Sequence, residues 1–193
     1  DRIFIMEVVS IILAAGKGKR MNSDLPKPLH KIAGRSLINW LENSLDEVKV
    51  TKKLYILGHQ SDKLKKFIGA ADYIIQEPQL GTGHAVKLTK NKIKNHESII
   101  IIAYADTPFV PSDKIKKMIS QIKNGYDISI LGFLASNPKG YGRVVKNGNE
   151  VIKIVEEIDT DDKTKKNNLC NSGILAGRAS KIYNYLNQVK KSN

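Results

Sequence analysis

Residues 8–18 read Val-Val-Ser-Ile-Ile-Leu-Ala-Ala-Gly-Lys-Gly. The β-branched apolar run at 8–13 predicts a buried strand, and the small residues that follow it predict a loop. Gly16 and Gly18 let the backbone turn tightly and approach a ligand closely. The same loop is surrounded by positive charge, supplied by Lys17, Lys19, Arg20 and Lys27. A strand that runs into a glycine-rich basic loop is typical of a phosphate-binding site.

Apolar runs and amphipathic stretches alternate along much of the chain. Strands are predicted at 8–13, 53–57, 73–75, 98–103, 128–134 and 171–176, and helices at 36–45, 61–68, 82–89, 112–123 and 179–189. This alternation predicts an α/β fold with a Rossmann-like, mainly parallel sheet flanked by helices. Asn147-Gly148 separates two further strands, at 143–146 and 151–155, and predicts a small β-hairpin insertion. The charged segment 159–168 is predicted to be a mobile loop.

Composition limits the class of protein. The 193 residues suit one α/β domain, which we expect to span 6–193, with Met6 as a natural start and Cys170 as a buried thiol. No apolar run approaches the roughly 20 residues that span a bilayer, and no export signal is evident, so a cytoplasmic location is expected.

The net charge of +13 suggests a nucleic-acid partner. The lysines are spread over several predicted helices without interleaved aromatic residues, so we expect no nucleic-acid or membrane partner. The oligomeric state stays unknown.

The segment Gln76-Glu77-Pro78-Gln79-Leu80-Gly81-Thr82 follows another predicted strand. The two glutamine side chains each carry a donor and an acceptor, which are the groups that read the edge of a base. Gly81 permits close approach of a ligand, and Thr82 can bond to that ligand. An ordinary β–α turn with a capping threonine also fits this segment.

Two charged residues have the positions that a phosphate-metal site needs. Lys27 lies between Pro26 and Pro28, which push its backbone toward an extended shape and present its ammonium group as a point charge. Asp106 comes directly after a buried strand, where its carboxylate can hold Mg²⁺ together with substrate phosphates. An exposed loop lysine and a helix cap are the simpler interpretations.

A last group of polar residues lies in the second half of the chain. Gly142 stands in the segment Asn137-Pro138-Lys139-Gly140-Tyr141-Gly142-Arg143 and can offer its backbone to a ligand. Glu156 and Asn171 supply acceptors and donors suited to sugar hydroxyls or an acetamido group. Each could be a turn or strand-end residue alone, but their joint presence favours a sugar site.

Together these motifs resemble the nucleotidyltransferases that make nucleotide sugars. The most similar family is the pyrophosphorylase domain of the bacterial bifunctional N-acetylglucosamine-1-phosphate uridyltransferase and glucosamine-1-phosphate acetyltransferase. The segment L-A-A-G-x-G-x-R-M and a downstream lysine mark the broad superfamily. The narrower family is indicated by Q-x-x-Q-L-G-T-G-H-A, N-P-x-G-Y-G-R, V-E-E and N-x-G in that order. The resemblance runs from about Val8 to Ala179.

The resemblance implies a reaction in which UTP and N-acetylglucosamine 1-phosphate give pyrophosphate and UDP-N-acetylglucosamine, a cell wall precursor. Mg²⁺ is the implied cofactor, with Asp106 as its ligand, and Arg20 and Lys27 are expected to stabilise charge on the phosphates. The implied nucleotide-binding residues are Leu13, Ala14, Ala15, Gly16, Lys27, Gln76, Gly81, Thr82, Tyr104, Ala105 and Asp106. The implied sugar-binding residues are Gly142, Glu156 and Asn171.

The sequence departs from the family pattern in three ways. Ala105 replaces the glycine usual before the metal aspartate; alanine is small, and whether its added methyl group crowds the nucleotide stays open. The sequence stops at Asn193, before the part of the family's domain that supplies a second metal-binding asparagine. The acetyltransferase β-helix is also absent, so we expect a nucleotidyltransferase domain shortened at its C-terminal end. Two alternatives stay open: another sugar 1-phosphate or nucleotide as substrate, and a nucleotide-binding module without turnover.

Overall fold

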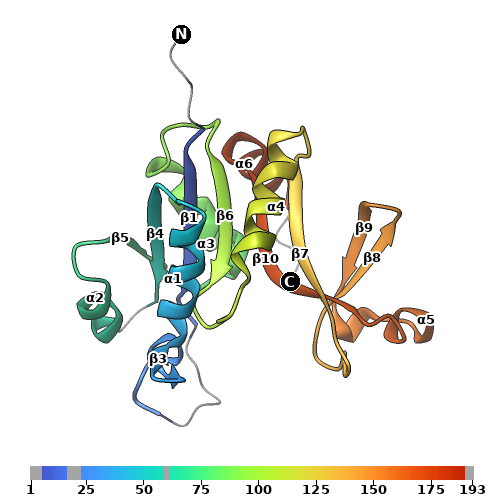
Figure 1. The fold of residues 1–193 in the computed structure, drawn as a ribbon, viewed down its shortest axis with the longest axis horizontal. Coiled ribbons are helices and arrows are strands. Elements are labelled where there is room, and N and C mark those ends of the chain that lie inside the picture. The colour runs from blue at the N-terminus through green and yellow to red at the C-terminus, as the bar shows by residue number, and fades with distance from the viewer. Residues whose placement is uncertain (1–5, 17–22, 59–60, 190–193) are drawn as a thin grey trace. The chain divides into compact units, whose positions relative to one another are not determined.

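A computed structural model describes residues 6–16, 23–58 and 61–189. The chain divides into two compact units (Figure 1). The first unit contains the residues up to Ser129 and those from Leu175 onward, and the second unit is Ile130–Ile174. Strands β7 (Ile128–Leu134) and β10 (Leu169–Arg178) contribute residues to both units. Within the described ranges, no helix is long and apolar enough to cross a membrane.

The first unit is built on a sheet in which the strand order is β5-β4-β1-β6-β10. Its parallel strands are β1 (Val8–Ala14), β4 (Lys52–Leu57), β5 (Asp72–Ile75) and β6 (Ile99–Tyr104). Residues 175–178 of β10 pair with β6 in the antiparallel direction. The prediction of a mainly parallel sheet is therefore confirmed, and the antiparallel β10 is a feature that the alternating pattern did not predict.

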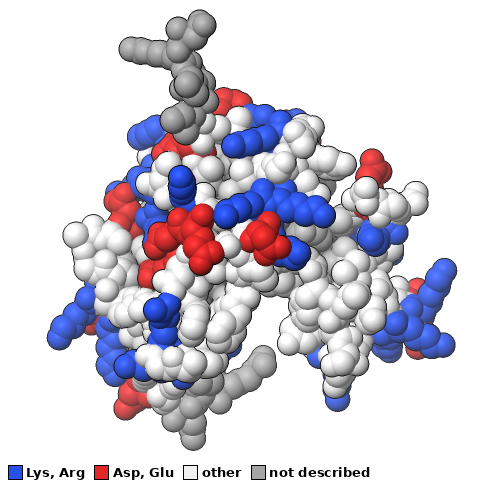
Figure 2. Space-filling model, viewed as in Figure 1, with Lys and Arg blue, Asp and Glu red and all other residues white. Residues whose placement is uncertain are grey.

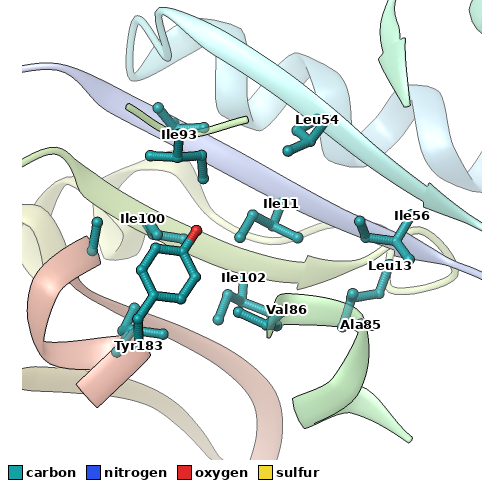
Figure 3. Packing of buried hydrophobic residues seen from close by; sticks show 13 residues of the cluster. Ile11, Leu13, Leu54, Ile56, Ala85, Val86, Ile93, Ile100, Ile102 and Tyr183 are labelled. Carbon is teal, nitrogen blue, oxygen red and sulfur yellow. The ribbon is translucent and has the colours of Figure 1, made fainter. Parts of the chain in front are cut away.

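Helices cover both faces of this sheet. Successive side chains of a strand point to opposite faces, and the apolar side chains of β1 and β6 are buried on both. The helices are α1 (Leu37–Glu47), α2 (Asp62–Ile68), α3 (Thr82–Leu88), α4 (Ser112–Lys123) and α6 (Ala179–Gln188). On one face Ile11, Ile100 and Ile102 pack against apolar residues of α3 and α6, including Tyr183 (Figure 3). On the other face the hydroxyl of Tyr55 donates a hydrogen bond to Glu42 of α1.

The connection between β1 and α1 contains short elements that the sequence patterns did not predict. It comprises the 3₁₀ helix η2 (Lys27–Leu29) and a two-stranded hairpin of β2 (Lys31–Ile32) and β3 (Arg35–Ser36). A second 3₁₀ turn, η3 (Thr89–Asn91), continues α3. Elements this short carry too few residues for a periodic pattern.

The second unit contains the predicted hairpin. Strands β8 (Arg143–Asn147) and β9 (Glu150–Val155) pair in the antiparallel direction across a turn in which Gly148 has a positive φ of 55°. Strand β10 pairs with both β7 and β8. The predicted loop at 159–168 is interrupted by helix α5 (Asp162–Lys165), which follows η4 (Glu157–Asp159), so the prediction is wrong for these helical residues and holds for 160–161 and 166–168. The Asp161 side chain stabilises α5 by accepting the Thr164 N–H at 2.7 Å.

Basic side chains do not form one continuous patch on the face shown in Figure 2, where acidic side chains lie among them. Several lysines are paired, for example Lys52 with Asp72 at 2.9 Å and Lys53 with Asp46 at 2.6 Å. This distribution matches the expected lysine-rich surface. Cys170 is buried, as predicted.

Candidate functional site

The carboxyl ends of the parallel strands meet at one edge of the first unit. The strand register pairs Leu13 with Tyr104, Ala14 with Leu57, and Leu57 with Ile75. The loops that follow these strands therefore begin side by side. This edge is where ligands bind in open α/β sheets. We call its predicted residues the nucleotide cluster: Ala15, Gly16, Lys27, Gln76, Gln79, Gly81, Thr82, Tyr104 and Asp106.

Lys27 and Asp106 come together at this edge. The Lys27 Nζ lies 2.7 Å from the Asp106 Oδ2, and the two side chains are 42% and 33% exposed. Lys27 begins the 3₁₀ helix η2 between Pro26, its N-cap, and the buried Pro28, so the extended backbone predicted for Lys27 is wrong. The predicted phosphate-binding cation and the predicted metal ligand are thus in direct contact, and both remain accessible to a solute.

Gln76 supports the loop that follows β5. The residue is 4% exposed, and its Nε2 donates to the Gly81 carbonyl at 2.9 Å and lies 3.3 Å from His84 Nδ1. Gly81 has a positive φ of 88° and precedes α3, which explains the need for glycine at this bend. These contacts indicate that Gln76 shapes the loop, while its contact with a base stays a prediction.

Gln79 joins the same loop to β1. Its Nε2 donates to the Ala15 carbonyl at 2.8 Å. Gly58 lies beneath this hydrogen bond, because a Cβ added there would come 2.3 Å from Gln79 Nε2 and 2.7 Å from Ala15 O. Sequence reasoning did not select Gly58. The sequence feature that could have identified it is a glycine directly after a predicted strand, which often marks a close approach of two backbones.

The remaining predicted nucleotide-binding residues differ in their exposure to solvent. Leu13 and Ala14 are buried within β1, so their side chains face the protein interior. Gly16 is exposed, and a Cβ added to it would meet no atom of the described residues within 4 Å. The Thr82 hydroxyl lies 3.2 Å from the Tyr104 hydroxyl. Ala105 is 0% exposed, which means that its methyl group is enclosed by protein.

The second unit brings its three predicted sugar residues together. The Asn171 N–H donates to the Gly142 carbonyl at 2.8 Å. A Cβ added to Gly142 would lie 3.3 Å from Glu156 Oε1, so the carboxylate passes close to this glycine. Asn171 Oδ1 in turn accepts the Gly173 N–H at 3.0 Å. We call Gly142, Glu156 and Asn171 the sugar cluster.

Arg20 lies outside the described residues. Among the residues that the structure does describe, no group of three or more His, Cys, Asp and Glu side chains could hold a metal ion. Magnesium, however, is often held by only one or two carboxylates together with substrate phosphates and water. The partly exposed carboxylate of Asp106 fits a site of that kind.

Residues 10–166 match the MobA-like NTP transferase domain. The chain belongs to this family. The nucleotidyltransferase class that the motifs indicated is therefore confirmed.

Curated relatives of this nucleotidyltransferase domain carry the name Bifunctional protein GlmU. The relative from Sphingopyxis alaskensis is 39% identical over 189 residues, which cover 96% of this chain and 42% of that protein. The relative from Parvibaculum lavamentivorans is 35% identical over 188 residues, covering 95% and 42%. The chain thus spans about two fifths of the length of these relatives.

Solved structures support the predicted fold. A UDP-glucose pyrophosphorylase complexed with UDP-glucose matches with a TM-score of 0.80 and 18% identity, over 97% of this chain and 81% of that one. HddC from Yersinia pseudotuberculosis matches with a TM-score of 0.73 and 25% identity, over 93% and 80%. The fold of this domain is the one found in sugar-nucleotide transferases.

Proposed function

We propose that this domain transfers a uridylyl group from UTP to N-acetylglucosamine 1-phosphate and releases pyrophosphate. The observation that carries the proposal is the 2.7 Å contact between Lys27 and Asp106 at the carboxyl edge of the parallel sheet. This contact gathers a cation for phosphates and a carboxylate for a divalent metal at the edge where a nucleotide would bind. The names of the curated relatives also favour this activity.

The nucleotide cluster would hold UTP. In the proposed reaction, a phosphate oxygen of the sugar phosphate attacks the α-phosphorus of UTP. A P–O bond forms there, the bond to the β-phosphate breaks, and pyrophosphate leaves with the electron pair. The attacking group is already an anion, so the reaction needs no general base. The main barrier is the approach of two anions and the charge that develops on the phosphates.

The charged residues of this edge would lower that barrier. Lys27 would bind the phosphates and neutralise part of their charge, and Arg20 is proposed to do the same. Mg²⁺, held by Asp106 and the substrate phosphates, would supply further positive charge there. In the second unit, the sugar cluster would bind the N-acetylglucosamine group through Glu156 and Asn171.

Release of pyrophosphate provides the test. The domain is mixed with UTP, dTTP, CTP or GTP, each with several sugar 1-phosphates and Mg²⁺. We expect the highest kcat/KM with UTP and N-acetylglucosamine 1-phosphate. Preference for another pair would replace the proposed substrates, and UTP binding without turnover would favour a nucleotide-binding module.

A matched pair of variants tests the role of the metal carboxylate. Asp106→Ala should abolish Mg²⁺-dependent turnover. Asp72→Ala removes another ion-paired carboxylate, at the start of β5 and away from the carboxyl edge, and should leave turnover unchanged. Normal activity in Asp106→Ala would rule out its proposed role. The cytoplasmic location expected from the sequence stays a prediction.

A further inference from the structure

Arg143 is a buried charged residue that the proposed reaction does not use. Its side chain is only 2% exposed. Its Nη1 lies 2.7 Å from Glu157 Oε2 and also donates to the Tyr141 carbonyl. Burying a guanidinium group is unfavourable unless its partners compensate, and among the described residues its Nε has no hydrogen-bond partner. Stability alone is therefore a poor explanation for arginine at this position.

The neighbours of Arg143 explain its position better. Along the chain it directly follows Gly142. Strand pairing places it opposite Val155 in β9, one residue before Glu156, and opposite Cys170 in β10, one residue before Asn171. Each member of the sugar cluster is thus one residue away from Arg143 or from a residue paired with it.

The ion pair with Glu157 adds a second connection. Glu157 directly follows Glu156 and begins η4, where its carbonyl accepts the Thr160 hydroxyl at 2.7 Å. The Arg143 guanidinium therefore ties the start of β8 to the chain just after Glu156. The same guanidinium holds the pKa of Glu157 below its usual range, so the carboxylate stays charged at neutral pH.

We propose that Arg143 and Glu157 act as a positioning pair that sets the spacing of the sugar cluster and thereby the affinity for a sugar 1-phosphate. The identity of this ligand rests on the proposed function. The spacing is tight. A Cβ at position 142 would lie 3.3 Å from Glu156 Oε1, and the Asn171 N–H donates to the Gly142 carbonyl at 2.8 Å. A small displacement of Gly142, which takes part in both contacts, changes both distances, and a misplacement of about 1 Å can cost up to ~100-fold in rate.

Two variants of Glu157 test the pair. Glu157→Leu removes both the charge and the acceptor, and Glu157→Gln keeps the size and one acceptor oxygen in case the leucine variant does not fold. The control is Asp162→Asn, which removes an exposed carboxylate of the same unit that lies 3.9 Å from Lys165. We expect the KM for N-acetylglucosamine 1-phosphate to rise about tenfold or more in Glu157→Leu and less in Glu157→Gln. The KM for UTP should stay unchanged in all three variants.

A second measurement does not depend on turnover. Hydrogen exchange of the Asn171 amide, followed by NMR, reports its bond to Gly142. This amide should exchange faster in the Glu157 variants and at the original rate in Asp162→Asn.

The outcomes separate the two proposals. Faster exchange at Asn171 with a raised sugar-phosphate KM supports the positioning pair. Unchanged exchange, or faster exchange with an unchanged KM, overturns it. If the unmodified domain does not use this sugar phosphate, the proposed substrate is wrong, and the exchange rate alone then supports or overturns the positioning pair.

Discussion

The ammonium group of Lys27 lies 2.7 Å from the carboxylate of Asp106, although the two residues come from different loops of the first unit. In the absence of a substrate, each charged group neutralises the other. In the proposed reaction, nucleotide phosphates would compete for the lysine, and a divalent metal would compete for the aspartate. The pair therefore holds both charges at the edge of the sheet and leaves both exchangeable.

Replacing Lys27 should affect the reaction far more than the fold. An exposed ion pair contributes at most about 1 kcal/mol, so Lys27→Met should change the free energy of unfolding by less than that. Loss of a charge that stabilises the transition state should lower kcat/KM by about 100-fold or more. Pyrophosphate release and urea unfolding measure the two effects. Lys65→Met, which removes an exposed lysine of α2 paired with Asp62, is the control and should change neither. Equal activity in the two variants would contradict the role of Lys27.

Gly58 should be intolerant of a side chain. In Gly58→Ala the new methyl group meets Gln79 Nε2 and the Ala15 carbonyl, and the backbone carbonyl cannot move aside as freely as a side chain can. We expect destabilisation by about 1–3 kcal/mol and weaker nucleotide binding, measured by urea unfolding and by calorimetry with UTP. Gln79→Ala alone removes the hydrogen bond without a clash. The double variant Gly58→Ala with Gln79→Ala should be no more stable than Gly58→Ala. If the double variant regained the stability of the original chain, the clash would be with Gln79 and not with the Ala15 carbonyl.

Ala105 should not crowd the nucleotide. Its methyl group is enclosed by protein, so Ala105→Gly removes a packed group and adds backbone freedom. We expect a loss of about 1 kcal/mol in unfolding free energy with the KM for UTP unchanged. A lower KM for UTP in Ala105→Gly would mean that the methyl group does crowd the nucleotide.

The buried hydroxyl of Tyr183 should make stability depend on alkaline pH. Thr89 Oγ1 donates to the Val86 carbonyl at 2.6 Å, so Tyr183, 2.8 Å away, donates to Thr89. Burial raises the pKa of Tyr183 above its ordinary value of 10.0. The folded state therefore holds this proton more tightly than the unfolded state, and the contribution is complete below pH 10 and falls as the pH rises above it.

Tyr183→Phe tests this dependence. The variant should be about 1 kcal/mol less stable at pH 7, and this difference should shrink above pH 10. Urea unfolding at pH 7, 9 and 10.5 measures it. Tyr126→Phe changes an exposed tyrosine and should have no effect at pH 7. A difference between Tyr183→Phe and the original chain that grows with pH would contradict the assignment.

Much of the fold could be predicted because its signals are local. The apolar runs that became β1 and β6 are buried on both faces, which requires a continuous hydrophobic stretch in the sequence. The helical spacing of Ile115, Ile119 and Ile122 likewise marked the buried face of α4. Asn147-Gly148 marked the hairpin turn. The segment 159–168 was misjudged because one turn of helix, capped by Asp161, has too few residues to show a period.

The sequence by itself determined the class of this protein: an α/β nucleotidyltransferase domain whose motifs carry Lys27, Asp106 and the two glutamines. These residues could be identified in the sequence because each lies next to a predicted strand end, a proline or a glycine. Only the tertiary structure decided that Lys27 contacts Asp106, that Gly58 must be glycine, and that Arg143 is buried against Glu157. The physical reason is that these contacts join residues from separate strands and loops, and strand register and packing set their distances.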